Sequence, residues 1–195
     1  LLYEDYKTMN ILRVIPSINP KAGGPISGAR NIDSELIKHG HTVEVLCLDD
    51  PDAEKYALDY PATVHILPGS NGHYRYNNSL VTWLKNNALR FDAVIVNGLW
   101  QYHSLAVWRA LSNSGTPYFV FTHGMLDPWF KKAYPIKHLK KWLYWPWAEY
   151  RVLRDAKAVF FTSEEERIQS RKSFWLYSCT EIVTPYGTLP PPSDS

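Results

Sequence analysis

The 195-residue chain has only two cysteines, no long apolar run and almost no excess of charge of either sign. Cys47 and Cys179 cannot build a disulfide framework and lack the spacing of a metal site, so we expect two buried free thiols. Apolar runs of about six residues are far shorter than the roughly 20 that a transmembrane helix needs. A net charge of +2 predicts no nucleic-acid partner.

Several motifs for catalysis and cofactor binding are also missing. The sequence has no H-E-x-x-H, no C-x-x-C and no carboxylate–histidine cluster, so we expect neither a metal site nor a cofactor. It has no G-x-S-x-G nucleophile elbow. Gly23-Gly24-Pro25 fits neither the dinucleotide fingerprint G-x-G-x-x-G nor a phosphate-binding loop with Gly-Lys-Ser/Thr.

Short apolar segments alternate with helical patterns along most of the chain. Such alternation predicts a parallel sheet that is covered on both faces by helices. The expected fold class is α/β, a Rossmann-like three-layer domain with a mostly parallel sheet of about seven strands. Strands are expected at 11–15, 43–48, 63–67, 93–97, 118–122, 157–161 and 181–184. Helices are expected at 25–39, 79–89, 104–112, 137–154 with an interruption at Pro146, and 163–173 with Ser163 and Glu166 as a capping box.

The ends of the chain differ from this pattern. Met9 directly precedes the first strand, so residues 1–8 are interpreted as an extension. Residues 9–188 form the predicted domain, and the proline-rich stretch 189–195 is interpreted as a linker or a cut end.

Ligands of open α/β sheets bind beyond the carboxyl ends of the strands, and this rule selects five loops. They span 16–25, 97–103, 122–128, 162–165 and 185–188. In the first loop, Gly23 and Gly24 precede a helix whose free amides suit an anion. The alternative is a tight turn with no ligand.

His123 follows a buried strand and precedes a glycine, so it is expected to face the crevice. A histidine there can donate to a hydroxyl or a phosphate, or act as an acid or base. The alternative is a histidine that only closes the strand end. Asp127 lies in the same loop, and Asn97, Trp100 and His103 occupy the adjacent one. Trp100 offers a flat face for a sugar ring, although plain packing explains it equally well.

The segment 131–157 is basic and aromatic, with eight Lys or Arg and two acidic residues. Four of the eight tryptophans lie between positions 129 and 147. On a helix, Leu139 and Leu143 fall on an apolar face and the lysines lie toward the other side. This composition suits an anionic membrane surface or a phosphate-linked glycan, or a packed helix with a solvated basic face. The expected surface residues are Lys137, Lys140, Lys141 and Trp145.

Five runs of the sequence together resemble family 4 retaining glycosyltransferases with the GT-B architecture. They are MNILRVIPSINPKAGGP, NGLWQYHSLAVW, THGMLDPWFKK, DAKAVFFTSEEE and IVTPYGT, and they extend over residues 9–188. The resemblance implies the N-terminal, acceptor-side domain of a two-domain enzyme. That enzyme would transfer a hexose from a UDP- or GDP-sugar to a polysaccharide or lipid-linked glycan without a metal.

The resemblance also implies roles for individual residues. His123 would contact the donor sugar as the catalytic residue, and Gly23 and Gly24 would lie near the donor phosphates. Asn97, Trp100, His103 and Asp127 are candidate acceptor contacts. The chain would be cytoplasmic, with peripheral attachment to the inner face of the plasma membrane.

The resemblance departs from the family where the second domain should begin. The paired glutamates and basic residues that hold the donor in the family are absent, so the 195 residues are expected to be inactive alone. The alternative interpretation is a non-catalytic, flavodoxin-like binding or interaction module that is complete as it stands. A second βα-rich domain encoded downstream would favour the first interpretation.

Overall fold

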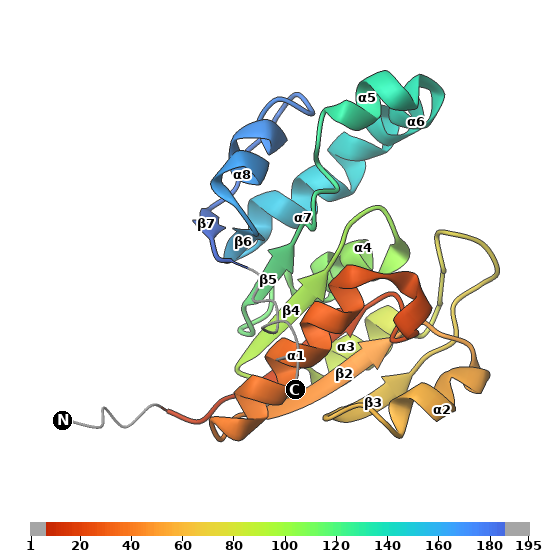
Figure 1. The fold of residues 1–195 in the computed structure, drawn as a ribbon, viewed down its shortest axis with the longest axis vertical. Coiled ribbons are helices and arrows are strands. Elements are labelled where there is room, and N and C mark those ends of the chain that lie inside the picture. The colour runs from red at the N-terminus through yellow and green to blue at the C-terminus, as the bar shows by residue number, and fades with distance from the viewer. Residues whose placement is uncertain (1–6, 186–195) are drawn as a thin grey trace, which may run out of the picture.

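Seven parallel strands form one sheet in the order β3-β2-β1-β4-β5-β6-β7 (Figure 1). This computed structural model describes residues 7–185. The strands are β1 (Asn10–Ile15), β2 (Thr42–Cys47), β3 (Thr63–Ile66), β4 (Ala93–Asn97), β5 (Tyr118–Phe121), β6 (Ala158–Phe161) and β7 (Glu181–Val183). The predicted α/β class and the seven-stranded sheet are confirmed. The chain reverses direction across the sheet between β1 and β4, which is the switch point where α/β proteins bind ligands.

Eight α-helices lie within residues 7–185. They are α1 (Gly24–Lys38), α2 (Glu54–Ala57), α3 (Leu80–Asn87), α4 (Tyr102–Leu111), α5 (Trp129–Ala133), α6 (Pro135–Tyr144), α7 (Glu149–Asp155) and α8 (Glu164–Ser170). The expected interruption at Pro146 is confirmed, because a 3-10 turn over Trp145–Trp147 separates α6 from α7. Proline lacks the amide that a continuous helix would need there. The short helices α2 and α5 were not expected.

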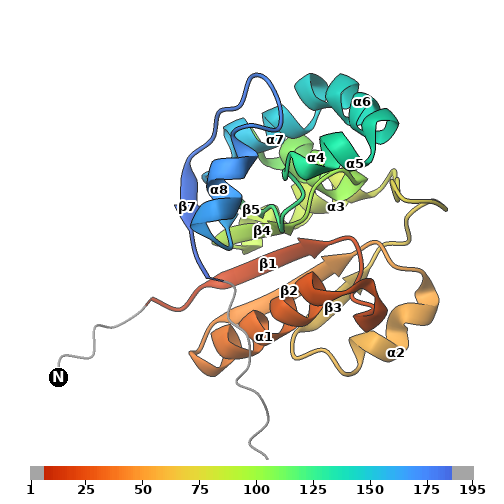
Figure 2. The same ribbon diagram turned by 45° about the horizontal axis from the view of Figure 1, so that its top comes forward.

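The sheet divides the core into two parts (Figure 2). On one face, α1 covers Ile15, Val45 and Cys47. On the other, α3, α4 and α7 cover the larger cluster that includes Leu12, Val96 and other strand residues. Cys47 and Cys179 are free thiols as expected, but Cys179 is only half-buried. The segment 185–188 and the stretch 189–195 lie largely or wholly outside the described residues.

Arg13 is a charged residue in the middle of an otherwise apolar central strand. Its side chain and that of Asp33 on α1 are both fully buried. The guanidinium Nε donates to both Asp33 carboxylate oxygens at 2.8 Å, and the Tyr60 hydroxyl donates to the same carboxylate at 2.9 Å. The remaining Nη1 donates to Asn97 Oδ1 at 2.7 Å. The pair therefore connects α1, β1 and β4 beneath the ligand edge of the sheet.

Replacing Asp33 with Ala should lower the free energy of unfolding by about 3–5 kcal/mol, because it leaves the Arg13 charge buried without its carboxylate. Urea unfolding followed by tryptophan fluorescence measures the change. Glu35→Ala is the matched control on the same helix, because the exposed Glu35–Lys38 pair should contribute no more than about 0.5 kcal/mol. Equal effects of the two variants would contradict the prediction.

Candidate active site

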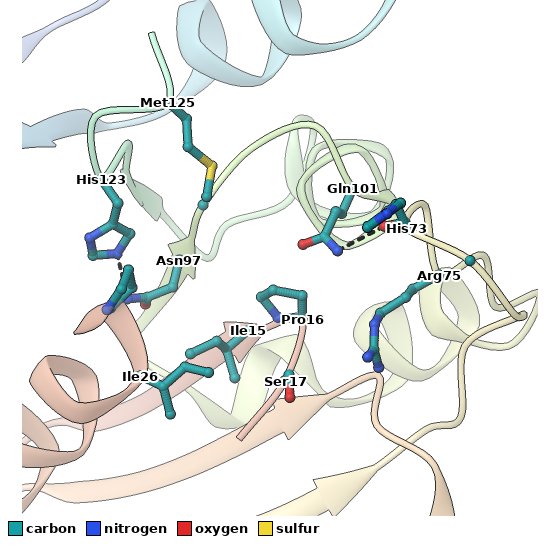
Figure 3. Close-up of a pocket in the computed structure, with 13 residues that line it drawn as sticks. Ile15, Pro16, Ser17, Ile26, His73, Arg75, Asn97, Gln101, His123 and Met125 are labelled. Atoms are coloured by element: carbon teal, nitrogen blue, oxygen red, sulfur yellow. Dashed lines mark hydrogen bonds between the residues drawn. The ribbon is translucent and has the colours of Figure 1, made fainter. Parts of the chain in front are cut away.

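A hollow of about 480 Å³ opens at the carboxyl ends of β1 and β4 (Figure 3). Its lining includes Pro16, Pro25, Arg75, Asn97, Gln101 and His123. Arg75 comes from the loop after β3, where its Nη1 donates to the Leu48 carbonyl at 2.9 Å. This hollow is called the first hollow below.

A second hollow of about 380 Å³ lies on the other side of His123. Its lining is polar and acidic, and it includes Gly124, Asp127, Ser163, Glu165, Gln169 and His123. His123 lines both hollows. A group bound in either hollow would therefore lie next to the same imidazole.

The backbone of His123 adopts a left-handed conformation with φ of +49°. Few residues other than glycine do so, and such positions are often found at functional sites. The ring stacks on Phe121 with 5.6 Å between the ring centroids, and its Nε2 lies 3.0 Å from Asn97 Nδ2. Two neighbours along β5 and β4 thus hold the ring at the edge of the sheet.

Burial is the main reason that the pKa of His123 falls to about 4; Glu166 opposes this shift and the nearby Arg13 charge adds to it. The imidazole is therefore neutral near pH 7. A neutral ring can form hydrogen bonds to a hydroxyl or a phosphate, but it supplies no positive charge.

Glu166 fixes the His123 loop to the start of α8. Its carboxylate accepts the Gly124 amide at 2.7 Å and the Thr122 hydroxyl at 2.5 Å, and also the amide and hydroxyl of Thr162 at 2.7 Å each. The predicted capping box is therefore half correct. Ser163 does accept from the Glu166 amide at 3.1 Å, but the Glu166 side chain joins two strand ends instead of returning to the Ser163 amide.

Gly23 and Gly24 lie exposed at the first turn of α1, next to Pro25 in the first hollow. Gly23 has a φ of +106°, which only glycine adopts easily. A Cβ at Gly24 would meet nothing within 4 Å among the described residues, so open space faces this turn. Their role toward a phosphate stays a prediction.

The four candidate acceptor residues do not gather at one place. Asn97 lines the first hollow and Asp127 the second. Trp100 packs on Trp145 and lines a separate hollow of about 300 Å³, below α6.

His103 was expected to face the crevice, but it is fully buried in α4. Its Nε2 donates to the Asn97 carbonyl at 2.9 Å, and burial lowers its pKa to about 4. Ala106 and Val107, three and four residues further along α4, pack into the core, and His103 shares that inward side. An acceptor contact by its side chain is therefore not supported.

The expected surface of Lys137, Lys140, Lys141 and Trp145 is wrong for Trp145 and only partly exposed at Lys141. Trp145 has 0% of its surface exposed, because it stacks on Phe174 and donates its Nε1 proton to the Trp175 carbonyl at 2.6 Å. Lys141 is half-buried over the Trp100 ring, with 4.5 Å from Nζ to the ring centroid. Lys137 and Lys140 are exposed as expected.

The apolar side of α6 faces away from the protein, in contrast to the usual amphipathic arrangement. Ile136, Leu139 and Leu143 are 75%, 58% and 61% exposed, and no residue of α6 is buried. Figure 1 shows α5 and α6 at one end of the molecule, far from β2 and β3. Exposed residues of the two helices form what we call the α6 surface: Lys131, Lys132, Ile136, Lys137, Leu139, Lys140, Trp142 and Leu143.

The residues that orient the site were missed by the sequence prediction. Arg13 and Asp33 had a usable signal, since a charged residue within an apolar strand requires a buried partner. Glu166 was noticed, but only as a cap. Arg75 lies in a loop without a motif, and only the fold brings it to the first hollow.

The fold and this crevice define a class of domain, namely a Rossmann-like half-domain of the GT-B type. Residues 23–175 match the profile of a family described as "Glycosyl transferase 4-like domain". The chain therefore belongs to the glycosyl transferase 4-like family. A sequence search of curated proteins finds no match.

Several solved structures share the fold at low sequence identity. The chain resembles Anabaena HepE in complex with UDP and glucose, with a TM-score of 0.61 and 14% identity over 92% of this chain and 45% of HepE. A second HepE structure, with UDP, gives 0.62 and 14% over 92% and 44%. Acinetobacter baumannii MurG gives only 0.48, with 16% identity over 77% of this chain and 40% of MurG. The chain thus spans less than half the length of these proteins.

Among residues 7–185, no helix is both long and apolar enough to cross a bilayer. The same residues contain no group of three or more His, Cys, Asp or Glu side chains that could hold a metal ion.

Replacing Glu166 with Ala should lower the free energy of unfolding by about 2–4 kcal/mol, because the Gly124 and Thr162 amides lose their acceptor. Burial favours the protonated acid, yet the hydrogen bonds from Thr122, Thr162 and Gly124 hold the pKa of Glu166 below its ordinary 4.5. Its stabilisation is therefore complete above pH 4.5 and is lost as the pH falls further.

Urea unfolding at several pH values tests this, with the exposed neighbour variant Glu165→Ala as control. The stability difference between wild type and Glu166→Ala should shrink below pH 4.5, whereas Glu165→Ala should differ little at any pH. A constant difference between pH 7 and pH 3 would show that the Glu166 carboxylate does not supply it.

Proposed function

We propose that this chain is the acceptor-side half of a retaining glycosyltransferase. The enzyme would transfer a hexose from a UDP- or GDP-sugar to a polysaccharide or lipid-linked glycan. The observation that supports this best is the neutral His123 between two hollows at the carboxyl edge of the sheet. Membership of the glycosyl transferase 4-like family supports the same reaction class.

The residues at this edge have complementary roles in the proposed reaction. The Gly24 amide and the positive end of α1 would stabilise phosphate charge on the donor, and the Gly23 amide would join them by giving up its long 3.4 Å hydrogen bond to the Pro20 carbonyl. His123 would hydrogen-bond the donor sugar, and Asp127 would contact an acceptor hydroxyl. Asn97 is buried, with its amide held by Arg13 and His123, so it would position His123 instead of contacting the acceptor. The departing phosphate would assist acceptor attack on the same face of the sugar, with no metal ion.

The donor would be held mainly by a second domain that these 195 residues do not contain. HepE, to which the chain is similar, is more than twice as long as the matched region. We therefore expect no sugar transfer by the 195-residue chain alone.

We also propose that the α6 surface binds the headgroup region of an anionic membrane on the cytoplasmic side. Three exposed aliphatic side chains on one helical face would enter the interface, and the exposed lysines of α5 and α6 would meet anionic headgroups. The lysines flank the apolar residues rather than lying opposite them, so both kinds of contact can form at once. A lipid-linked acceptor would then be within reach of the crevice.

In the longer enzyme, His123→Ala should reduce kcat/KM for sugar transfer by about 100-fold, because one hydrogen-bond donor to the transition state is lost. His39→Ala is the matched control, since His39 is exposed and its ring contacts the carbonyl of Glu35 on its own helix at 2.8 Å. Near-normal transfer by His123→Ala would refute the role of His123. Measurable transfer by the isolated 195 residues would refute the two-domain proposal.

The double variant Leu139→Glu, Leu143→Glu should reduce co-flotation with anionic vesicles at least tenfold, because each buried leucine contributes about 1.5–3 kcal/mol. The control pair is Leu58→Glu, Leu89→Glu, two leucines that are exposed elsewhere on the protein. Vesicles of phosphatidylcholine alone should bind the wild type weakly. Equal flotation of both double variants would contradict the membrane proposal.

A further inference from the structure

Asn97 contacts two histidines through different groups. Its backbone carbonyl lies 2.9 Å from His103 Nε2, and its side-chain Nδ2 lies 3.0 Å from His123 Nε2. A carbonyl can only accept, so the neutral His103 carries its proton on Nε2. The proton position on His123 depends on which way the Asn97 amide is oriented.

Arg13 decides that orientation. A guanidinium has donors and no acceptor, and Arg13 Nη1 lies 2.7 Å from Asn97 Oδ1. A flipped amide would place its NH2 group against the guanidinium, donor facing donor, at a buried position. The NH2 group must therefore face His123.

We propose that Arg13, through Asn97, fixes His123 as the neutral tautomer with its proton on Nδ1. The Asn97 NH2 group donates to Nε2, so Nε2 must be the acceptor and Nδ1 holds the ring proton. Asp33 acts indirectly, because its carboxylate binds the other edge of the Arg13 guanidinium and holds it in place. Arg13 and Asn97 are thus positioning residues for His123.

The charged groups around His123 are consistent with a neutral ring. Arg13 on β1 disfavours a cation, and Glu166 on α8 favours one, while burial disfavours it most. Asp127 and Glu165 line the same second hollow. The amide of Asn97 adds no charge of its own, so it selects the tautomer without favouring the imidazolium.

The consequence for catalysis rests on the proposed function, whereas the proton position does not. A neutral His123 with its proton on Nδ1 donates from that nitrogen and has its basic nitrogen engaged by Asn97. It would therefore orient a sugar hydroxyl by donating a hydrogen bond and would not act as a general base through Nε2.

Long-range ¹H–¹⁵N NMR of the imidazoles in the 195-residue chain tests the proposal directly at pH 7. His123 should show a pyrrole-like Nδ1 and a pyridine-like Nε2, whereas His103 should show the reverse. A His123→Gln variant assigns the His123 signals. A wild-type His123 with its proton on Nε2, or an averaged mixture of tautomers, would overturn the proposal without any mutation.

Asn97→Asp provides the second arm, because a carboxylate only accepts. His123 should then move its proton to Nε2, while His103, held by the backbone carbonyl, should keep its tautomer. Asn113→Asp is the matched control at an exposed asparagine and should change neither ring. If the His123 tautomer is unchanged in Asn97→Asp, the proposal is refuted.

Transfer assays of the longer enzyme separate the two proposals. If His123 acts as proposed, Asn97→Asp should lower kcat by about 10–100-fold, as changes to outer partners of a catalytic group commonly do. A confirmed tautomer with normal transfer by His123→Ala would leave the proton assignment standing and refute the proposed function. If His123→Ala slows transfer but the NMR experiment finds another tautomer, only the role of Arg13 and Asn97 is refuted, and the proposed function stands.

Discussion

The buried contact between Arg13 and Asp33 is the interaction on which the candidate site depends. A charge in the central strand of a sheet is costly unless it is paired and its hydrogen bonds are satisfied. Asp33 and Asn97 together satisfy the guanidinium from α1 on one side and β4 on the other. The same requirement that fixes α1 on the sheet therefore fixes the amide that holds His123.

His123 is held from two directions by groups of different chemistry. The Asn97 amide contacts its ring, and the Glu166 carboxylate contacts the backbone at the next residue, Gly124. The first contact fixes the ring, and the second stabilises a loop whose φ at His123 is +49°. Because the two supports come from β4 and α8, the imidazole lies where the two hollows meet. A left-handed backbone at a residue other than glycine persists only where surrounding contacts hold it in place. The Asn97 and Glu166 contacts do so here.

The sequence predicted the sheet well because each strand is a short apolar run next to a helical pattern. Ala93–Asn97, for example, has the same bounds in the sequence prediction and in the structure. Local patterns also located His123 at a strand end and the interruption at Pro146. They could not locate the contacts of Arg13, which depend on residues 20 and 84 positions away. They also placed His103 in the crevice, because a residue near a strand end and a residue at the start of a helix look alike in sequence.

Helix α6 shows that the spacing of apolar residues predicts an apolar helix face but not whether that face points toward the protein or toward solvent. The spacing of Leu139 and Leu143 is the same whether that face packs on the sheet or meets something else. What decides is the other side of the helix, where Lys141 lies over Trp100 and the Tyr144 hydroxyl lies 2.9 Å from that of Tyr74. Lys141 and Tyr144 therefore occupy the side of α6 that faces the protein, and the aliphatic side chains face the solvent. An apolar helix face in water carries the unfavourable free energy of exposed hydrocarbon. An anionic membrane interface would bury that hydrocarbon and would also attract the lysines that border it.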